Sequence, residues 1–368
     1  MKSEHNKPFK GLKVLELASV LAGPLAGSFL AEGGATVIKV EHPELGDITR
    51  SWRIEGERKD DPNSAYFAAA NTFKNVIKKD LSSDEGRQWL ENELSNCDIL
   101  LQNFKASDLK KFNLIPEKVA QKYPNIIHIR LIGFAESPDR LAYDVVVQAE
   151  TGFMYMNGHP ENHGTKIPVA IIDILASHQI RSAVTTGLYA RERGATGWFA
   201  EVSLELSGIG ALVNQATNYL MNGSIPQRRG SIHPNIAPYG EHLELDGGEI
   251  VLAIGSDAQF ISLCEVLGDL ELHKNPKYLT NQDRVSNRLE LITELQKLAN
   301  GKNRESLLQK FHKARVPAGG IRSLDEVFAP GSPGMKAVIN EEITSSTRPI
   351  RKPKTTAYSV TIFGNDML

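Results

Sequence analysis

Residues 14–41 read VLELASVLAGPLAGSFLAEGGATVIKVE. The apolar run at 14–17 predicts a buried strand, and the small residues after it predict a tight loop. Pro24 is expected at the first helical position, because it lacks an N–H that a helix start leaves unpaired. The helix is expected to end before the Gly-Gly pair, and the β-branched run at 36–40 predicts a second strand. Strand, helix and strand in this order favour a parallel sheet with a crossover helix.

The same alternation continues through the first 150 residues and predicts an α/β fold. The later helix at 173–193 is predicted from apolar positions that recur every three or four residues. The remaining elements of this part are expected as strands at 76–79, 98–102, 126–131 and 199–204 and as helices at 82–95 and from 205 to about 221.

A stretch rich in Pro, Gly and Arg at 223–240 predicts a domain boundary. The segment after it carries a hairpin signal, Asp246-Gly247-Gly248, followed by helical patterns to about residue 314. We therefore expect a large domain at 1–222, completed by a C-terminal return at about 330–368, and a smaller α+β domain at 223–329.

The composition excludes several classes of protein. The 368 residues carry a net charge of -2, with 42 basic and 44 acidic side chains, which argues against a nucleic-acid partner. Cys97 and Cys264 form no CxxC motif, so neither a zinc site nor a disulfide framework is expected. The first residues are polar and no apolar run suits a membrane span, so we expect a cytoplasmic protein with no metal and no membrane partner.

The first strand–loop–helix unit also resembles a dinucleotide-binding fold, with Glu41 near the position of a ribose-binding carboxylate. However, the loop reads AGPLAG at 22–27, not G-x-G-x-x-G, and Pro24 removes a backbone N–H that a pyrophosphate would need. An NAD-dependent oxidoreductase is therefore disfavoured. We interpret Gly27 as a glycine that permits close packing of the helix on the sheet.

An ordered set of segments resembles the family III CoA-transferases of the formyl-CoA and carnitine CoA-transferase type. The likeness covers roughly residues 9–330, and the order of the segments is more specific than any one of them. The segments are LAGP at 21–24, VIKVE at 37–41, GDITR at 46–50, CDILLQNF at 97–104, YDVVVQAETG at 143–152, VAIID at 169–173, YARER at 189–193 and DAQF at 257–260.

The resemblance implies an open Rossmann-like large domain, a small domain and two chains interlocked as a homodimer. It implies an enzyme that moves CoA between an acyl-CoA and a small carboxylic acid, with coenzyme A as part of the substrate and no metal. It also implies a covalent route, in which a carboxylate forms an acyl anhydride and then an aspartyl-CoA thioester.

The residue that matches the family's nucleophile is Asp173. From the residues alone, an Asp between an apolar run and an amphipathic helix is most simply an N-cap. Asp is also an established covalent nucleophile, and a helix start is expected to keep its carboxylate ionised. Ala176 and Ser177 are small and leave space beside it. With the resemblance, the catalytic interpretation of Asp173 is preferred.

Three further residues are candidates for the CoA site. Asn103 and Phe104 follow a strand end and match the family's CoA-binding position, so the ring could pack on adenine and the amide could bind phosphate or ribose. The alternative is a turn residue beside a core Phe. Lys111 best matches a basic position of the family that neutralises phosphate, although lysines on a helix are usually a solvated face.

Five other residues are expected near the substrates. His42 stands where the formyl-CoA enzymes have an arginine, and Leu21 replaces a glutamine, so backbone N–H groups near Ala22 are expected to stabilise the intermediate. Tyr143 either bonds near the active carboxylate or is a core tyrosine. His233 either meets the substrate or serves as a hinge. Together with Arg228 and Arg229, His233 is a candidate for binding a second carboxylate of the acid.

Two rival functions stay open on sequence alone. The α-methylacyl-CoA racemases share the fold but use a His-Asp pair where this chain has Tyr143-Asp144, and tyrosine is a poor base for proton abstraction. An acidic residue at Asp257 fits either enzyme. The second rival is a non-catalytic CoA-binding scaffold, against which the presence of Asp173 with small neighbours argues. A CoA-transferase is therefore the preferred prediction.

Overall fold

The computed structural model describes residues 7–341 and 349–358. The chain divides into two compact units, one containing Met1–Met154, Lys166–Pro226 and Lys336–Leu368 and the other Tyr155–Thr165 and Gln227–Met335. Residues 155–165, which the expected bounds place in the large domain, belong to the second unit. They are tied to it by hydrogen bonds from Gly230 N to the carbonyl of Gly158 and from the Arg228 guanidinium to the carbonyl of Tyr155.

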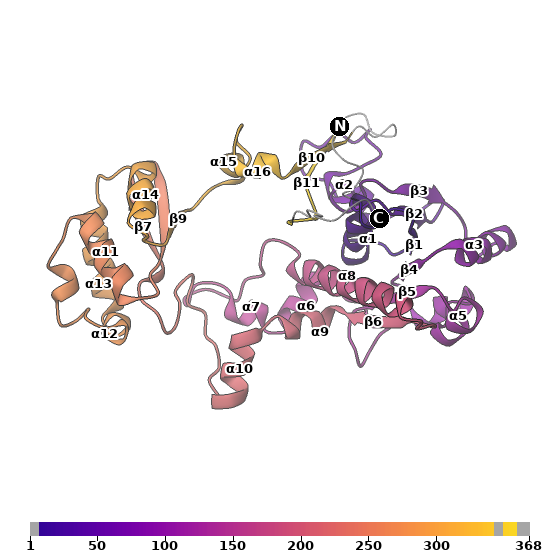
Figure 1. Ribbon diagram of the computed structural model, residues 1–368, viewed down its shortest axis with the longest axis horizontal. Helices are drawn as coiled ribbons and strands as arrows, with labels where there is room; N and C mark the ends of the chain where they lie inside the picture. The colour runs from indigo at the N-terminus through magenta and orange to yellow at the C-terminus, as the bar shows by residue number, and fades with distance from the viewer. Residues whose placement is uncertain (1–6, 342–348, 359–368) are drawn as a thin grey trace. The chain divides into compact units, whose positions relative to one another are not determined.

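The first unit is built on a six-stranded parallel sheet with the order β3-β2-β1-β4-β5-β6 (Figure 1). All six strands expected in this part of the chain are confirmed within one residue at either end. The strands are β1 (Lys13–Leu17), β2 (Thr36–Glu41), β3 (Asn75–Lys78), β4 (Ile99–Gln102), β5 (Ile127–Ile132) and β6 (Phe199–Ser203).

Helices cover both faces of this sheet, and an antiparallel pair, β10 (Val338–Glu341) and β11 (Ile350–Pro353), belongs to the same unit. On one face lie α1 (Ala22–Glu32), α8 (Ile171–Glu192) and α9 (Leu204–Gly210), and on the other lie α3 (Asp84–Asn96) and α5 (Pro116–Lys122). The unit also contains η2 (Ile48–Ser51), α2 (Ala65–Ala70), α4 (Ala106–Lys111), α6 (Asp144–Glu150) and α10 (Val213–Asn222). Two short helices are divided between the units: α7 (Phe153–Met156) begins in the first, and α16 (Pro333–Lys336) belongs to the second except for its last residue.

The alternation of side chains along each strand produces two separate apolar cores. Val14 of β1 packs with α1 and α8, whereas its neighbour Leu15 packs with α3 and α5. The same division holds in β4, where Ile99 and Leu101 face the first core and Leu100 faces the second. Because both faces are covered, the central strands β1, β4 and β5 are buried along almost their whole length.

Three details differ from the sequence predictions. Pro24 is the third residue of α1 instead of the first; the position suits proline equally, since the first four N–H groups of a helix lack intrahelical acceptors. The predicted helix up to residue 221 is two helices, α9 and α10. The long helix begins two residues earlier than expected, at Ile171.

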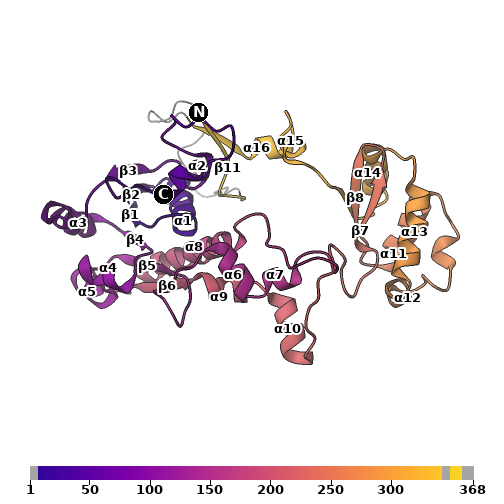
Figure 2. The same ribbon diagram turned by 180° about the vertical axis from the view of Figure 1, so that it is seen from behind.

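The second unit has a three-stranded antiparallel sheet with helices packed on it (Figure 2). The expected hairpin is confirmed, with positive φ at both Gly247 and Gly248 in its turn. Its elements are β7 (Tyr239–Leu245), β8 (Gly248–Ala253), β9 (Ala318–Gly320), α11 (Asp257–Leu267), η3 (Leu272–Lys274), α12 (Asn281–Ser286), α13 (Arg288–Ala299), α14 (Arg304–Lys313) and α15 (Leu324–Val327).

β1 and β4 lie side by side in the middle of the large sheet. β2 and β3 follow β1 on one side, and β5 and β6 follow β4 on the other, so the strand order reverses between β1 and β4. In open α/β sheets, ligands bind beyond the carboxyl ends of the strands at such a point. A ligand site in this unit is therefore expected at the loops that follow β1 and β4. Within the described residues, no helix has the length and apolar character needed to cross a membrane.

Candidate active site

A cavity of about 340 Å³ lies where the strand order predicts a ligand site. Its walls come from the loop after β1, the end of β2 and the segment after it, the loop after β3 and the loop after β4. Three of the residues selected from the sequence line it: His42, Asn103 and Phe104. The structure thus brings these three residues together around one cavity.

Asn103 joins the two loops that flank the reversal point. Its amide nitrogen donates to the carbonyl of Ser19, and its Oδ1 accepts from the backbone N–H of Ser19, each at 3.3 Å. The side chain thus already has partners in the loop after β1. This contact explains why an amide suits the position, since only a side chain with both a donor and an acceptor can serve both groups of one residue.

Phe104 is held in place by its own backbone. Its N–H donates to Gln102 Oε1 at 2.7 Å, and its carbonyl accepts from Nε and Nη2 of Arg130 at 3.4 and 3.3 Å. Its ring lies 5.3 Å from that of Phe112. Because Phe104 is only half-buried and lines the cavity, an aromatic surface is available to a ligand.

Basic and hydroxyl groups stand at the edge of the same cavity. Lys111 is exposed and donates from Nζ to Ser82 Oγ at 2.8 Å, and Ser82 lines the cavity. His42 is also exposed, and its Nδ1 accepts the backbone N–H groups of Glu44 and Leu45 at 3.2 and 3.3 Å. With Nδ1 as the acceptor of these two bonds, Nε2 is the ring nitrogen that can donate to a ligand.

Asp173 is the third residue of α8 and does not cap it. The N-cap is Ala170, and the Asp173 carboxylate has neither a hydrogen bond nor an ion pair with residues 7–341 or 349–358. The N-cap interpretation of Asp173 is therefore wrong. The carboxylate is half-buried, and burial together with the charge of Asp144 raises its pKa to about 7. The helix start was expected to keep this carboxylate ionised, but with a pKa of about 7 it is only partly ionised near neutral pH, because burial and the charge of Asp144 disfavour the charged form.

Asp144, the first residue of α6, stabilises the start of α8. Its Oδ1 accepts the backbone N–H of Ile172 at 2.8 Å, and its Oδ2 accepts Gln148 Nε2 at 2.6 Å. Gln148 in turn accepts the N–H of Ile167 at 2.8 Å. Asp144 therefore fixes the segment on both sides of Ala170 and places a second carboxylate beside Asp173. No local motif around Asp144 indicates this role, because its partner Ile172 is distant in the sequence.

Tyr66 is a second residue near Asp173 that the sequence analysis missed. Burial and the charges of Asp173 and Asp144 raise the pKa of its hydroxyl, so this hydroxyl lies within electrostatic range of both acids. The ring of Trp52 meets that of Tyr66 edge to face at 5.0 Å. Tyr66 is the second residue of α2, and no local motif marks it; the proximity arises only from folding.

The expected backbone donors lie at the start of α1. Leu21 is its N-cap and is half-buried, and Ala22 is its first residue and is buried. The first N–H groups of a helix have no intrahelical acceptor and can bind an anion. Tyr143 is the N-cap of α6 and is 52% exposed, so the alternative of a core tyrosine is wrong.

Comparisons with known proteins identify the family. The model of CoA-transferase family III matches residues 9–357. The succinate–glutarate CoA-transferase of Agrobacterium fabrum is 36% identical over 328 residues, which cover 88% of this chain and 82% of the relative. The human succinyl-CoA:glutarate CoA-transferase is 33% identical over 327 residues, covering 88% and 74%. A CAIB/BAIF family protein from Brucella suis has a crystal structure with a TM-score of 0.82, 36% identity and coverage of 97% and 93%.

The chain belongs to CoA-transferase family III.

As a CoA-transferase, it moves CoA from an acyl-CoA donor to a free carboxylic acid. Glu41 does not fit the dinucleotide-binding alternative. Its carboxylate is buried and forms two 2.8 Å contacts with Arg50, so it is not free to bind a ribose. Gly27 has the packing role expected of it, since a Cβ there would lie 1.8 Å from Glu16 Oε2.

His233 and Asp257, which the sequence indicated as candidates, lie in the second unit of the CoA-transferase. His233 accepts the N–H of Asn235 at Nδ1, its carbonyl accepts from Arg288 at 2.7 Å, and its ring meets Tyr239 at 5.2 Å. Asp257 forms a 2.7 Å ion pair with the buried Arg284. Within the described residues, no group of three or more His, Cys, Asp or Glu side chains is arranged to hold a metal.

Proposed function

We infer that this CoA-transferase works through the carboxylate of Asp173. The observation that carries the proposal is the state of this group: half-buried, without a hydrogen-bond partner among the described residues, and beside Asp144 and Tyr66. A carboxylate used only for structure is normally hydrogen-bonded, as Asp144 is. A buried acid with a strongly raised pKa is instead typical of a functional site.

The reaction consists of balanced acyl and CoA transfers. One Asp173 oxygen attacks the thioester carbonyl of the donor, the C–S bond breaks, and an aspartyl–acyl anhydride and CoA thiolate result. The thiolate attacks the aspartyl carbonyl and releases the first acid, leaving an aspartyl-CoA thioester. The incoming carboxylate attacks this thioester and expels CoA thiolate. The thiolate then attacks the acyl carbonyl of the new anhydride, which frees Asp173 and forms the new acyl-CoA.

The neighbours of Asp173 have separate parts in this scheme. Asp144 positions Asp173 through the N–H of Ile172 and keeps a second negative charge nearby. That charge favours the neutral anhydride and thioester over the free carboxylate. The N–H groups at the start of α1, near Leu21 and Ala22, are assigned to the oxyanion, and the hydroxyls of Tyr66 and Tyr143 to the substrate acid. No step of this scheme requires a metal ion.

We assign CoA to the cavity at the reversal point of the sheet. Phe104 supplies the aromatic face for adenine, and His42 and Lys111 supply donors and positive charge for the phosphates. Asn103 acts by holding the two flanking loops together, since its amide already bonds Ser19. In this scheme the first unit is the CoA-binding domain.

The proposed donor is succinyl-CoA and the proposed acceptor is a small dicarboxylic acid. The support comes from relatives named for succinate, glutarate, citramalate and mesaconate that are 27% to 36% identical. Arg229 of the second unit is exposed and its guanidinium has no partner among the described residues, which suits it to a second carboxylate together with His233. The proposed assembly is the interlocked homodimer of the family, and the proposed compartment is the cytoplasm.

The proposal is tested by incubating the enzyme with succinyl-CoA and glutarate and measuring glutaryl-CoA. We expect transfer by the parent enzyme and a loss of at least about a thousandfold in Asp173→Asn, the range seen when a covalent nucleophile is removed. Equal rates in both proteins would remove Asp173 from the mechanism. A racemase would instead exchange the α-proton of a branched acyl-CoA with deuterium without moving CoA, and a scaffold would bind CoA and do neither.

A further inference from the structure

A cluster of buried charges borders the cavity, and the chemistry described above uses none of it. Glu16 on β1, Lys39 on β2 and Asp47 before η2 are each no more than 2% exposed. Lys74, whose side chain is fully buried, pairs with Glu16 at 2.8 Å. Burying ion pairs is costly, and apolar residues of the same size are often at least as stabilising. The cluster therefore needs an explanation other than stability.

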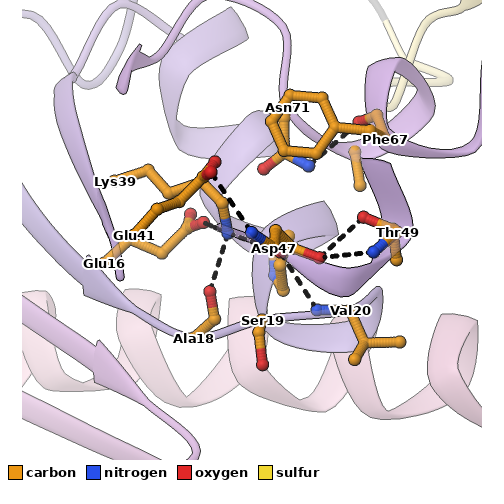
Figure 3. Close-up of polar contacts among 12 residues, drawn as sticks. Glu16, Ala18, Ser19, Val20, Lys39, Glu41, Asp47, Thr49, Phe67 and Asn71 are labelled. Carbon is orange, nitrogen blue, oxygen red and sulfur yellow. Dashed lines mark hydrogen bonds and ion pairs between the residues drawn. The ribbon is translucent and has the colours of Figure 1, made fainter. Parts of the chain in front are cut away.

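Lys39 connects three separate segments of the chain (Figure 3). Its Nζ lies 3.3 Å from Glu16 Oε1 and 3.0 Å from Asp47 Oδ2, and it donates to the carbonyl of Ala18 at 2.8 Å. These three contacts use the three protons of the ammonium group. Lys39 is thus fully occupied by protein and holds the first residue of the loop that follows β1.

Asp47 holds the next part of the same loop from the other side. Its Oδ2 accepts the N–H of Val20 at 3.3 Å, and its Oδ1 accepts the N–H and hydroxyl of Thr49 at 3.0 and 2.7 Å. Burial opposes ionisation of Asp47, but Lys39 and Thr49 outweigh it, and the pKa of the carboxyl is lowered. Asp47 therefore acts as a charged acceptor that anchors the loop to the start of η2.

The loop that this pair holds is strained. Val20 has a φ of 73°, a left-handed conformation that a β-branched residue rarely adopts. Such a conformation persists only where the surroundings impose it, and it is concentrated at functional sites. The residues on either side are Ser19, which bonds Asn103, and Leu21, which caps α1. Releasing Val20 would therefore alter both the cavity wall and the start of α1.

We propose that Lys39 and Asp47 are positioning residues that hold the 18–21 loop in its strained form and thereby shape the CoA-binding cavity. The proposal rests on the proposed function, because it assigns CoA to that cavity. Both residues line the cavity floor, but their polar groups are already bonded to protein. They act through the loop and do not take part in the transfer itself.

The main test uses the double variant Lys39→Met/Asp47→Asn, which removes one positive and one negative charge and leaves the Glu16–Lys74 pair intact. We expect a folded protein whose Kd for CoA, measured by calorimetry, rises at least about tenfold, the effect of losing one or two well-placed hydrogen bonds. Adding Val20→Gly should recover part of this loss, because glycine adopts the left-handed conformation without strain. A purely structural role of the pair would predict no recovery.

The matched control is Glu32→Gln/Lys352→Met, which removes another buried ion pair of the first unit, at the far end of α1. This variant should bind CoA within about twofold of the parent. Should the main double variant fail to fold, Asp47→Asn with and without Val20→Gly gives the same comparison. CoA binding unchanged in the folded variant, no recovery with Val20→Gly, or an equal loss in the control would each overturn the proposal.

CoA binding also separates this proposal from the proposed function. A parent protein that binds no CoA would refute both. A parent that binds and transfers CoA, with network variants that match it, would refute only the positioning role of Lys39 and Asp47.

Discussion

The Asp144 carboxylate accepts the backbone N–H of Ile172 at 2.8 Å, one residue before Asp173. The structural task of holding the helix start is therefore performed by Asp144 and not by Asp173. Asp144 stabilises the start of α8, and Asp173 is left unbonded among the described residues. The nearby negative charge then adds to burial in raising the pKa of Asp173 to about 7.

The first prediction concerns the pH dependence of turnover. Asp173 must be ionised to attack a thioester, and its pKa is about 7. We therefore expect kcat/KM for succinyl-CoA to rise about tenfold per pH unit below this value and to level off above it. A profile that stays flat between pH 5 and pH 8, in a protein shown to remain folded, would contradict the assignment.

A second prediction follows for Asp144→Asn. The amide keeps an acceptor for the N–H of Ile172 and removes the charge beside Asp173, so the midpoint of the pH profile should move to lower pH. Burial is the larger cause of the raised pKa of Asp173, so in Asp144→Asn this pKa should still lie above that of an exposed Asp. Asp144→Ala serves as the comparison: it loses the capping bond as well, and its stability should fall by about 1 kcal/mol. Identical pH midpoints in the parent and Asp144→Asn would show that the two carboxylates do not interact.

The contribution of Asp173 to folding stability should fall as pH rises, whereas the contribution of an acid with a lowered pKa rises with pH. The pKa is higher in the folded protein than in the unfolded chain, so the folded state binds more protons between about pH 4 and pH 7, and stability falls as pH rises. Asp173→Asn should therefore match the parent at pH 4 and exceed it by about 2 kcal/mol at pH 8, after allowance for partial exposure. Urea denaturation at both pH values measures this, with the exposed Glu117→Gln as control. A variant that is no more stable than the parent at pH 8 would contradict the raised pKa.

Phe104→Ala should weaken CoA binding without affecting the acid substrate. Stacking of a base on an aromatic side chain contributes about 1–3 kcal/mol, so the KM for succinyl-CoA should rise at least about fivefold. The backbone contacts of Phe104 with Gln102 and Arg130 stay available in the variant, which argues against a general loss of fold. Phe104→Tyr keeps the ring and should bind nearly normally. Equal effects of both substitutions would argue against stacking.

Arg229→Ala should distinguish dicarboxylic from monocarboxylic acceptors. Its guanidinium has no partner among the described residues, so its loss costs the protein no internal contact. We expect at least about a tenfold lower kcat/KM for glutarate and little change for butyrate, since a buried or shielded charged hydrogen bond contributes about 1.5–3 kcal/mol. His233→Ala is the parallel variant. Unchanged glutarate turnover in both would refute a second carboxylate site in this segment.

The central strands were predictable because each is a short, largely apolar run between turn residues, and burial on both faces of a parallel sheet favours such runs. By contrast, the sequence of β9 is Ala-Gly-Gly, which carries no strand signal. The break between α9 and α10 was missed for a different reason: the sequence pattern of both helices is continuous and does not mark where one ends.

The candidate site was predictable only where a local motif carried it. Asn103 and Phe104 follow a strand end, and strand ends in such sheets gather at one edge. Tyr66 and the contact between Asp144 and Ile172 depend on packing between distant segments, which periodicity does not reveal. The buried pair of Glu16 and Lys39 left a usable signal: both interrupt apolar strands, and the parallel register of β1 and β2 sets them opposite each other.

The central claim is that Asp173 carries the acyl group and then CoA. The most direct measurement is mass spectrometry of the enzyme after incubation with succinyl-CoA and trapping with hydroxylamine, which converts an activated aspartyl group to a hydroxamate. We expect a modification on the peptide that contains Asp173, absent from Asp173→Asn and absent without succinyl-CoA. A transfer-active enzyme with no modification at Asp173, or with the same modification in Asp173→Asn, would contradict it.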